Sequence, residues 1–192
     1  MKQITLIGFI LMCLAQLYVP AKMIFQNENI ITKGELFKFK TEPVDPNDPF
    51  RGKYIRLNFE ASQFKVIDTT QSYRAANTVY VLLENNSQGF AQIKDLRLEA
   101  PATDQAYLKV SQLYFSSFRD TTTIQIEYPF DRFYLEESKA PDAERLYFEA
   151  LRDSNLTTYA RVYIYQGQAT LEDVLINEMP ISEWVEINRD KE

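Results

Sequence analysis

The sequence predicts a mainly β protein built from antiparallel sheets, in a sandwich or barrel-like arrangement, with an apolar helix at its N-terminus. Aromatic residues are 14% of the 192-residue chain, with 12 Tyr and 13 Phe, and aromatic residues favour strands over helices. Short segments in which apolar and polar residues alternate recur between turn signals along most of the chain. Such alternation is typical of antiparallel strands that bury one face.

The N-terminal segment, residues 4–25, is almost entirely apolar and has the length of a short membrane-spanning helix. We expect residues 1–25 to be retained as an anchor that contacts membrane lipid. Val19-Pro20-Ala21 also has the small-residue pattern of a cleavage site, so a cleaved signal peptide is one alternative. A helix buried in a soluble core is the other. Lysines flank the segment on both sides, so the charges alone do not orient it.

The turn at residues 45–52 is the most distinctive part of the sequence. Asp45, Pro46 and Asp48 are typical turn residues, because proline fixes φ and short acidic side chains bond to nearby backbone N–H groups. Arg51 and Gly52 end the turn, and glycine permits a backbone angle or a close approach that a Cβ would block. A ligand or metal site on the two aspartates is the alternative, although the spacing lacks the glycine and distal glutamate of an EF-hand loop.

A strand is expected directly after this turn, over residues 53–60. Ile55, Leu57 and Phe59 share one face of this strand, and Tyr54 lies among the polar residues of the other face. We therefore expect Leu57 and Phe59 in the core, and Tyr54 pointing away from them.

Further strands are expected at short spacing between turn signals. Their residue ranges are 36–39, 78–83, 90–93, 95–98, 107–118, 124–128, 161–165 and 169–171. The segment 107–118 changes face near Ser111, which indicates a bulge. Residues 181–187 are expected to close the chain as a strand or a docking tail.

One short amphipathic helix is expected at residues 141–152. Between Ala143 and Leu151 its apolar residues recur at i, i+3, i+4, i+7 and i+8, which is the spacing of one helix face. Acidic residues in its first turn match the helix dipole. We interpret it as a packed structural helix rather than a lid.

Two hairpins in the sequence resemble each other. Residues 78–101 and 161–180 share the order Val-Tyr-Val/Ile, turn glycine, alanine, aspartate and proline. We therefore predict two similar β-modules, residues 30–101 and 105–187, followed by a tail at residues 188–192. Ordinary hairpins that share turn chemistry are the alternative.

The composition excludes several classes of function. A net charge of −6 and a pI of about 4.9 argue against nucleic-acid binding, which needs a basic surface. Histidine is absent, which excludes Ser-His-Asp and Cys-His catalysis and removes the commonest transition-metal ligand. The single cysteine, Cys13, lies in the apolar segment, so we expect neither a disulfide framework nor a thiolate site. No cofactor is predicted.

Carboxylates are the only plausible catalytic groups, since general acid–base catalysis needs two groups with different pKa values. The candidate groups are Asp45 with Asp48, and Asp131 with Glu136 and Glu137. Each group lies beside a turn or an expected edge strand, where solvated charges are common. The sequence therefore favours a binding function over an enzymatic one.

The stretch DPNDPFRGKYIRLNF, residues 45–59, resembles the motif that names the GDYXXLXY family of membrane-anchored proteins. That motif is a proline-and-aspartate turn followed by an arginine, GDY, a leucine and a tyrosine. Lys53 stands where the motif has its aspartate, and Phe59 stands where it has its last tyrosine. A catalytic carboxylate at the first of these positions is therefore not expected. With the N-terminal apolar segment, the likeness spans nearly the whole chain.

The segment IEYPFDRFYLEE, residues 126–137, resembles the second landmark of that family, an aromatic run that ends in acidic residues. It contains Arg132, Tyr134 and Glu136, which we group with the first turn and strand as motif residues of structural or interaction importance. Pro-Phe precedes Tyr134 as it precedes Tyr54. On this alignment, Arg132 takes the place of Gly52.

The resemblance implies a single-pass membrane protein whose C-terminal domain lies outside the cytoplasm, in the periplasm. The family has no established activity, and its members tend to be encoded beside polytopic membrane proteins, which implies such a protein as the partner. We therefore expect an interaction or accessory subunit that presents a surface or a sheet edge. The alternatives are a carboxylate-dependent hydrolase and an envelope protein that binds a small apolar ligand among its Tyr and Phe side chains.

Overall fold

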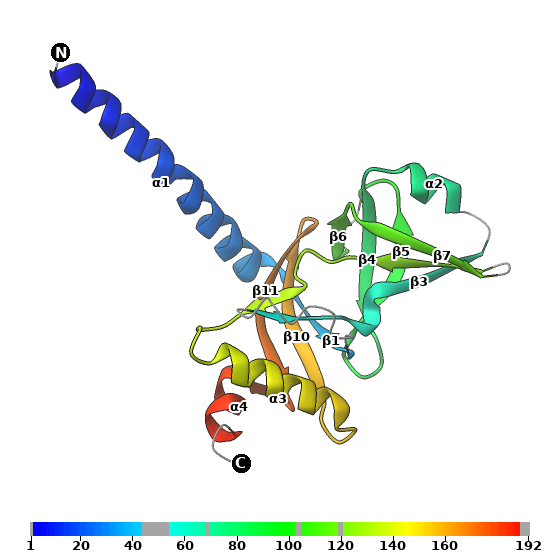
Figure 1. Ribbon diagram of the computed structural model, residues 1–192. Helices are drawn as coiled ribbons and strands as arrows, with labels where there is room; N and C mark the ends of the chain where they lie inside the picture. The colour runs from blue at the N-terminus through cyan, green and yellow to red at the C-terminus, as the bar shows by residue number, and fades with distance from the viewer. Residues whose placement is uncertain (1, 44–53, 68–69, 103–104, 119–120, 189–192) are drawn as a thin grey trace.

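The computed structural model describes residues 2–43, 54–67, 70–102, 105–118 and 121–188. A long N-terminal helix projects from a body of several antiparallel sheets and short helices (Figure 1). The predicted fold class, mainly β with antiparallel sheets and an N-terminal helix, is confirmed. Within the described residues the strands form open sheets, and no sheet closes into a barrel.

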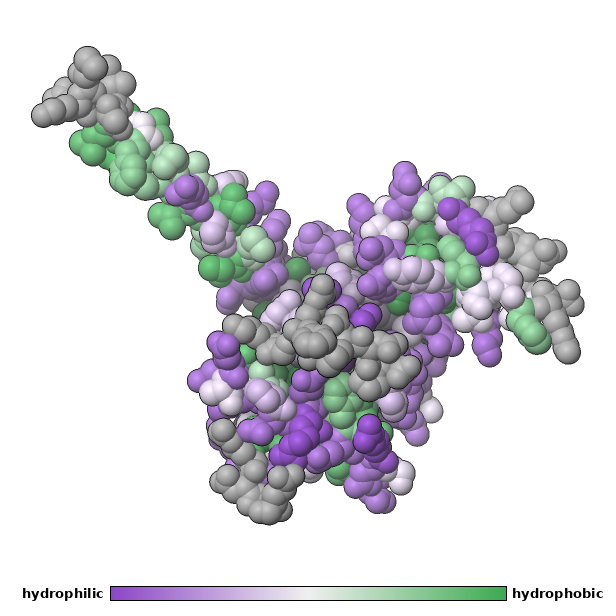
Figure 2. Space-filling view, viewed as in Figure 1, coloured by the Kyte–Doolittle hydropathy of each residue, from purple (hydrophilic) through white to green (hydrophobic). Residues whose placement is uncertain are grey.

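Helix α1 (Lys2–Lys33) contains the predicted apolar segment and continues through Pro20. Its residues Leu6–Lys33 are long and apolar enough to cross a membrane, judged by length and composition, and none of the apolar window is buried. Figure 2 shows the apolar surface of this helix standing clear of the more polar body. The alternative of a helix buried in a soluble core is therefore wrong.

α1 runs directly into the β-domain, because Gly34 is the single residue between the helix and β1 (Glu35–Lys40). The last helical turn packs on the domain through the buried side chain of Ile30. The Gly34 N–H donates to the Ile30 carbonyl oxygen at 2.8 Å. A Cβ at Gly34 would lie 2.3 Å from that oxygen and 3.0 Å from the carbonyl oxygen of Ile164. This close approach requires a residue without a side chain.

The largest sheet has the strand order β1-β10-β11-β12. Its later strands are β10 (Thr158–Tyr165), β11 (Gln168–Ile176) and β12 (Met179–Pro180). Phe37 and Phe39 of β1 lie opposite Val162 and Ala160 of β10, and all four side chains are buried. The predicted strand at 36–39 and the predicted hairpin at 161–171 are confirmed.

A second sheet has the order β5-β4-β6, with β4 (Val79–Asn85), β5 (Ala91–Arg97) and β6 (Tyr107–Val110). The β4–β5 hairpin confirms the prediction for residues 78–98. The β4–β5 and β10–β11 hairpins each contain one irregularity of register. Beside each irregularity an aspartate, Asp95 or Asp173, accepts the N–H of the next residue, at 2.9 and 2.7 Å. The two hairpins therefore share the same local arrangement, a register irregularity beside an aspartate that accepts the N–H of the next residue.

The remaining strands form two separate antiparallel sheets, which we call the first and the second arm. The first arm pairs β2 (Tyr54–Arg56) with β9 (Arg132–Tyr134). The second arm pairs β3 (Gln63–Ile67) with β8 (Thr121–Ile126), and β7 (Leu113–Phe118) extends it on the far side of β8. The 3₁₀-helix η1 (Glu60–Ser62) connects β2 to β3.

The paired residues of one arm correspond to the paired residues of the other arm by a constant shift in residue number. Tyr54 lies opposite Tyr134, and the residues 69 positions away from them, Thr123 and Lys65, also lie opposite each other. The same step relates Ile55–Phe133 to Ile124–Phe64, and Arg56–Arg132 to Gln125–Gln63. The core-facing positions are thus apolar in both arms, whereas the outward-facing positions differ in chemistry.

Each hairpin also pairs with a strand from the other half of the chain. β1, from the first half, pairs with β10, and β6, from the second half, pairs with β4. On this basis we propose that residues 30–101 and 105–187 are related modules that exchange their first strands. The registers favour Thr123, rather than Tyr134, as the equivalent of Tyr54.

An aromatic cluster fills the centre of the core where the two arms meet β1. Its members are Phe39, Phe59, Tyr128 and Phe130, and their ring centroids are 5.0–6.0 Å apart. The Tyr128 hydroxyl donates to the carbonyl oxygen of Ala61 at 2.5 Å. This hydrogen bond satisfies a polar group that burial would otherwise leave unpaired.

The predicted helix at 141–152 is confirmed as α3 (Ala140–Arg152). The expected strand or tail at 181–187 is instead the helix α4 (Ile181–Asn188). Its buried residues, Ile181 and Val185, are four positions apart, so the helical period prevails over the alternation seen in the sequence. A short helix, α2 (Thr70–Ala75), was not predicted.

Two strand predictions are wrong in extent. The strand expected over residues 53–60 is regular only to Arg56, although Leu57 and Phe59 are buried as predicted. The strand expected over residues 107–118 is divided between two sheets, because the chain leaves β4 after Val110 and joins β8 from Leu113 onward. The change of face in the sequence marks this division and not a bulge.

Candidate functional site

The outward face of the β2–β9 arm carries two tyrosines and two arginines. Tyr54 and Arg56 on β2, with Arg132 and Tyr134 on β9, alternate with core-facing residues such as the fully buried Ile55. Strand pairing places Tyr54 opposite Tyr134 and Arg56 opposite Arg132. We call Tyr54, Arg56, Arg132 and Tyr134 the Tyr–Arg quartet.

Contacts within the quartet hold one arginine in place. The rings of Tyr54 and Tyr134 are 5.6 Å apart, and the Arg132 guanidinium lies 5.2 Å from the centre of the Tyr54 ring. Its Nε is 3.7 Å from a carboxylate oxygen of Asp131. Hydrogen bonding to Tyr134 and the charge of Asp131 raise the pKa of Arg132 above its usual value. Tyr134 is 65% exposed, so the quartet faces solvent.

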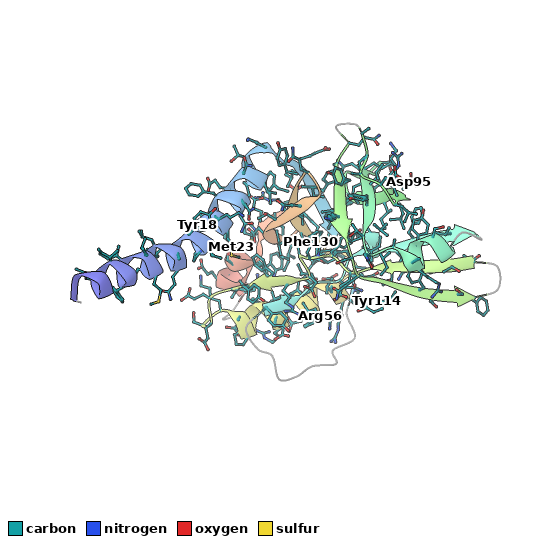
Figure 3. The ribbon with its side chains drawn as sticks, turned by 90° about the horizontal axis from the view of Figure 1, so that it is seen from above. Tyr18, Met23, Arg56, Asp95, Tyr114 and Phe130 are labelled. Atoms are coloured by element: carbon teal, nitrogen blue, oxygen red, sulfur yellow. The ribbon has the colours of Figure 1, made fainter. Side chains whose placement is uncertain are left out.

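A cavity of about 410 Å³ opens beside Arg56, and its volume is within the range of small-molecule sites. The Tyr114 hydroxyl donates to the Glu127 carboxylate at its wall, at 3.0 Å. In Figure 3, Arg56 and Tyr114 lie along the same edge of the molecule, and Phe130 lies deeper in the interior. The lining residues are Arg56, Leu57, Asn58, Phe59, Ser62, Tyr114, Gln125, Ile126, Glu127, Tyr128 and Asp131.

Two carboxylates whose pKa is raised, Glu42 and Asp173, do not line this cavity. Burial and the nearby Glu60 raise the pKa of Glu42, which accepts a hydrogen bond from the Asn58 amide at 2.7 Å. Burial raises the pKa of Asp173, which accepts the Val174 N–H. Among the described residues, no group of three or more His, Cys, Asp or Glu side chains could hold a metal ion.

The predicted motif residues divide into four groups. Asp45, Pro46, Asp48, Arg51 and Gly52 lie outside the described residues. Leu57 and Phe59 are buried and form part of the cavity wall. Tyr54, Arg132 and Tyr134 come together in the quartet, whereas Glu136 precedes α3, where its carbonyl oxygen accepts the N–H groups of Lys139 and Ala140.

Arg56 is the residue that the sequence-based interpretation did not single out. It lies two positions after Tyr54, so alternation places both side chains on the same face of a strand. What the sequence could not supply is the pairing of β2 with β9, which brings Arg132 directly opposite Arg56.

One comparison with known proteins gives a match. A family model described as GDYXXLXY protein matches residues 16–174, which include the second half of α1, the quartet, the β4–β5 hairpin and most of the β10–β11 hairpin. Neither a curated protein nor a solved structure matches the chain.

Proposed function

The chain belongs to the GDYXXLXY family, and from this premise we propose that it is a membrane-anchored interaction or accessory subunit for a polytopic membrane protein. In this proposal α1 is retained in the membrane and the β-domain lies outside the cytoplasm, in the periplasm. The observation that carries the proposal is the exposed apolar helix that continues without a linker into a folded β-domain.

The junction at Gly34 supports a role close to the membrane surface. If residues 4–25 occupy the bilayer, the helical residues 26–33 extend about 12 Å beyond it at 1.5 Å per residue. Ile30 is buried where α1 contacts β10 and β11, so this short stretch acts as a stiff spacer. The β-domain is thereby held near the loops of neighbouring membrane proteins.

The outward face of the β2–β9 arm supports binding as the mode of action. Tyrosine and arginine are enriched where protein interfaces gain most of their energy, and all four quartet residues belong to that class. The cavity beside Arg56 favours a second candidate, an envelope protein that binds a small polar ligand, because its volume of about 410 Å³ suits such a molecule.

Protease accessibility tests the location of the domain. Protease added to intact spheroplasts should remove the domain that follows α1 and leave a membrane-embedded fragment. Protection in intact spheroplasts, with digestion only after lysis, would contradict the proposed orientation. Release of the whole chain from the membrane by a change of salt alone would contradict the anchor.

Site-specific crosslinking tests the partner. A photoreactive residue at Tyr134 should capture one polytopic membrane protein in native membranes. The matched control is the same residue at Ile187, which is exposed on α4 and should capture it poorly. Equal capture from both positions, or capture of soluble proteins alone, would argue against an accessory subunit. Saturable binding of a small molecule at the cavity without any crosslinked partner would favour the second candidate.

A further inference from the structure

We propose that the Tyr–Arg quartet binds carboxylate groups in an acidic segment of a partner protein. The proposal deepens the function proposed above, and it rests on that function for the existence of a partner. It adds the chemistry of the segment that is recognised and the four residues that recognise it.

The fold itself does not require the quartet. The second arm has the same pairing at positions 69 residues away, and there Thr123 and Lys65 replace the two tyrosines. The arginine pair is replaced there by Gln125 opposite Gln63. Because the core-facing residues are apolar in both arms, core packing explains the residue types on the inner face. It does not explain the residue types on the outer face. The quartet is therefore best explained by something that it contacts.

The charges of the quartet indicate an anionic partner. Like charges directly opposite each other on paired strands destabilise a sheet, and Arg56 lies directly opposite Arg132. Within the described residues, Arg56 takes part in no ion pair. Arg132 is 3.7 Å from Asp131, which is longer than a charge-assisted hydrogen bond. A carboxylate placed between the two guanidinium groups would accept paired N–H donors and relieve their repulsion.

The tyrosines strengthen such a contact. Tyr54 and Tyr134 form the outward-facing pair next to the arginine pair, and their rings would shield one side of a carboxylate bound there from water. A charge-assisted hydrogen bond is stronger where water is excluded. Tyrosine also offers a large contact area with few rotatable bonds, so ordering it on binding costs little entropy.

The surroundings favour a protein segment over a membrane surface. Lipid surfaces are usually recognised by clusters of several lysines and arginines. Here the two arginines share their surroundings with the carboxylates of Asp131 and Glu127, which line the adjoining cavity with Arg56. This arrangement suits one or two carboxylates at defined positions rather than a sheet of phosphate groups. The net charge of −6 further restricts attraction for acidic groups to a local site.

The experiment is a binding titration of the full chain in detergent micelles with a fluorescent oligoglutamate peptide, followed by anisotropy. Oligoglutamine and oligolysine peptides of equal length are the probe controls. The test variant is Arg56→Gln with Arg132→Gln, which installs the pair that the second arm already contains. The matched control is Arg74→Gln with Arg97→Gln, which removes two exposed arginines on α2 and β5.

The quartet should bind oligoglutamate and not the other peptides. The Arg56→Gln/Arg132→Gln variant should weaken binding by at least about tenfold, since each lost charge-assisted bond accounts for roughly that factor. The Arg74→Gln/Arg97→Gln control should bind as the unchanged protein does. Arg56→Lys with Arg132→Lys should restore only part of the affinity, because an ammonium group lacks the planar fork.

Several results would overturn the proposal. If the test variant and the control variant weaken oligoglutamate binding equally, the binding is general charge attraction. If the unchanged protein does not bind oligoglutamate, an acidic segment is not the ligand of the quartet. Quartet-dependent binding to phosphatidylglycerol vesicles, with no binding to the peptide, would assign the surface to lipid. If the double variant unfolds, the single variant Arg56→Gln decides, and unchanged affinity would refute the role of Arg56. A crosslinked partner retained by the folded double variant would refute this inference and leave the accessory function standing.

Discussion

Replacement of Phe39 by alanine should destabilise the β-domain more than any exposed substitution. Phe39 is fully buried, and its ring centroid lies 5.5, 5.4 and 5.1 Å from those of Phe59, Tyr128 and Phe130. Buried Phe→Ala changes cost about 3–5 kcal/mol. Three edge-on ring contacts are lost here, each contributing roughly 0.5–1.5 kcal/mol beyond burial, so we expect the upper half of that range.

The measurement is urea unfolding of the full chain in detergent micelles, followed by Trp184 fluorescence and circular dichroism. The matched control is Phe118→Ala, since Phe118 is 73% exposed and exposed substitutions change stability by about 0.5 kcal/mol or less. Phe39→Leu should lie between them. If Phe39→Ala costs no more than Phe118→Ala, the aromatic cluster is not the centre of the core.

The other predictions concern the helix junction, alkaline stability and the proposed repeat. Gly34→Ala should lower stability by roughly 1–3 kcal/mol, because its Cβ meets two backbone oxygens that cannot move cheaply; an unchanged unfolding midpoint would refute the close approach. Burial raises the pKa values of Tyr128 and Tyr147, so the unfolded chain loses these protons above about pH 10 while the folded chain keeps them. The contribution of these two tyrosines to the free energy of unfolding should therefore be complete below that pH and should be lost as the pH rises further. Unfolding midpoints measured across this range should show a shallower decline for Tyr128→Phe, and an identical decline would refute the assignment. In an experimental structure, residues 54–66 should superpose on residues 123–135, and failure to superpose would refute the exchanged modules.

The local patterns of the sequence predict most of the secondary structure. Alternation in Leu36-Phe37-Lys38-Phe39 fixes β1 because one face of a strand must be buried. The apolar stripe of residues 141–152 fixes α3 by the same reasoning with a helical period. The sequence does not predict α4, because residues 181–185 fit both the helical period and the alternation of a strand, and the segment is too short to distinguish them.

Long-range pairing could not be predicted from the sequence. Nothing local in β1 indicates that it pairs with β10, or that β6 pairs with β4, since such contacts join distant segments. The sequence and the structure also suggest different alignments of the two hairpins. Matching Val79-Tyr80-Val81 with Val162-Tyr163-Ile164 gives one alignment, whereas matching Asp95 with Asp173 in the structure gives another. The quartet depends on the same kind of pairing, because only the register of β2 with β9 makes neighbours of Arg56 and Arg132.

The most direct test of the recognition surface is a nuclear magnetic resonance titration of the isotope-labelled chain in micelles with oligoglutamate. The side-chain Nε–H signals of Arg56 and Arg132 report directly on a bound carboxylate. We predict that these two signals shift together and saturate, while those of Arg74 and Arg97 stay in place. Signals from all four arginines that move in parallel, or quartet signals that stay unchanged, would contradict the account.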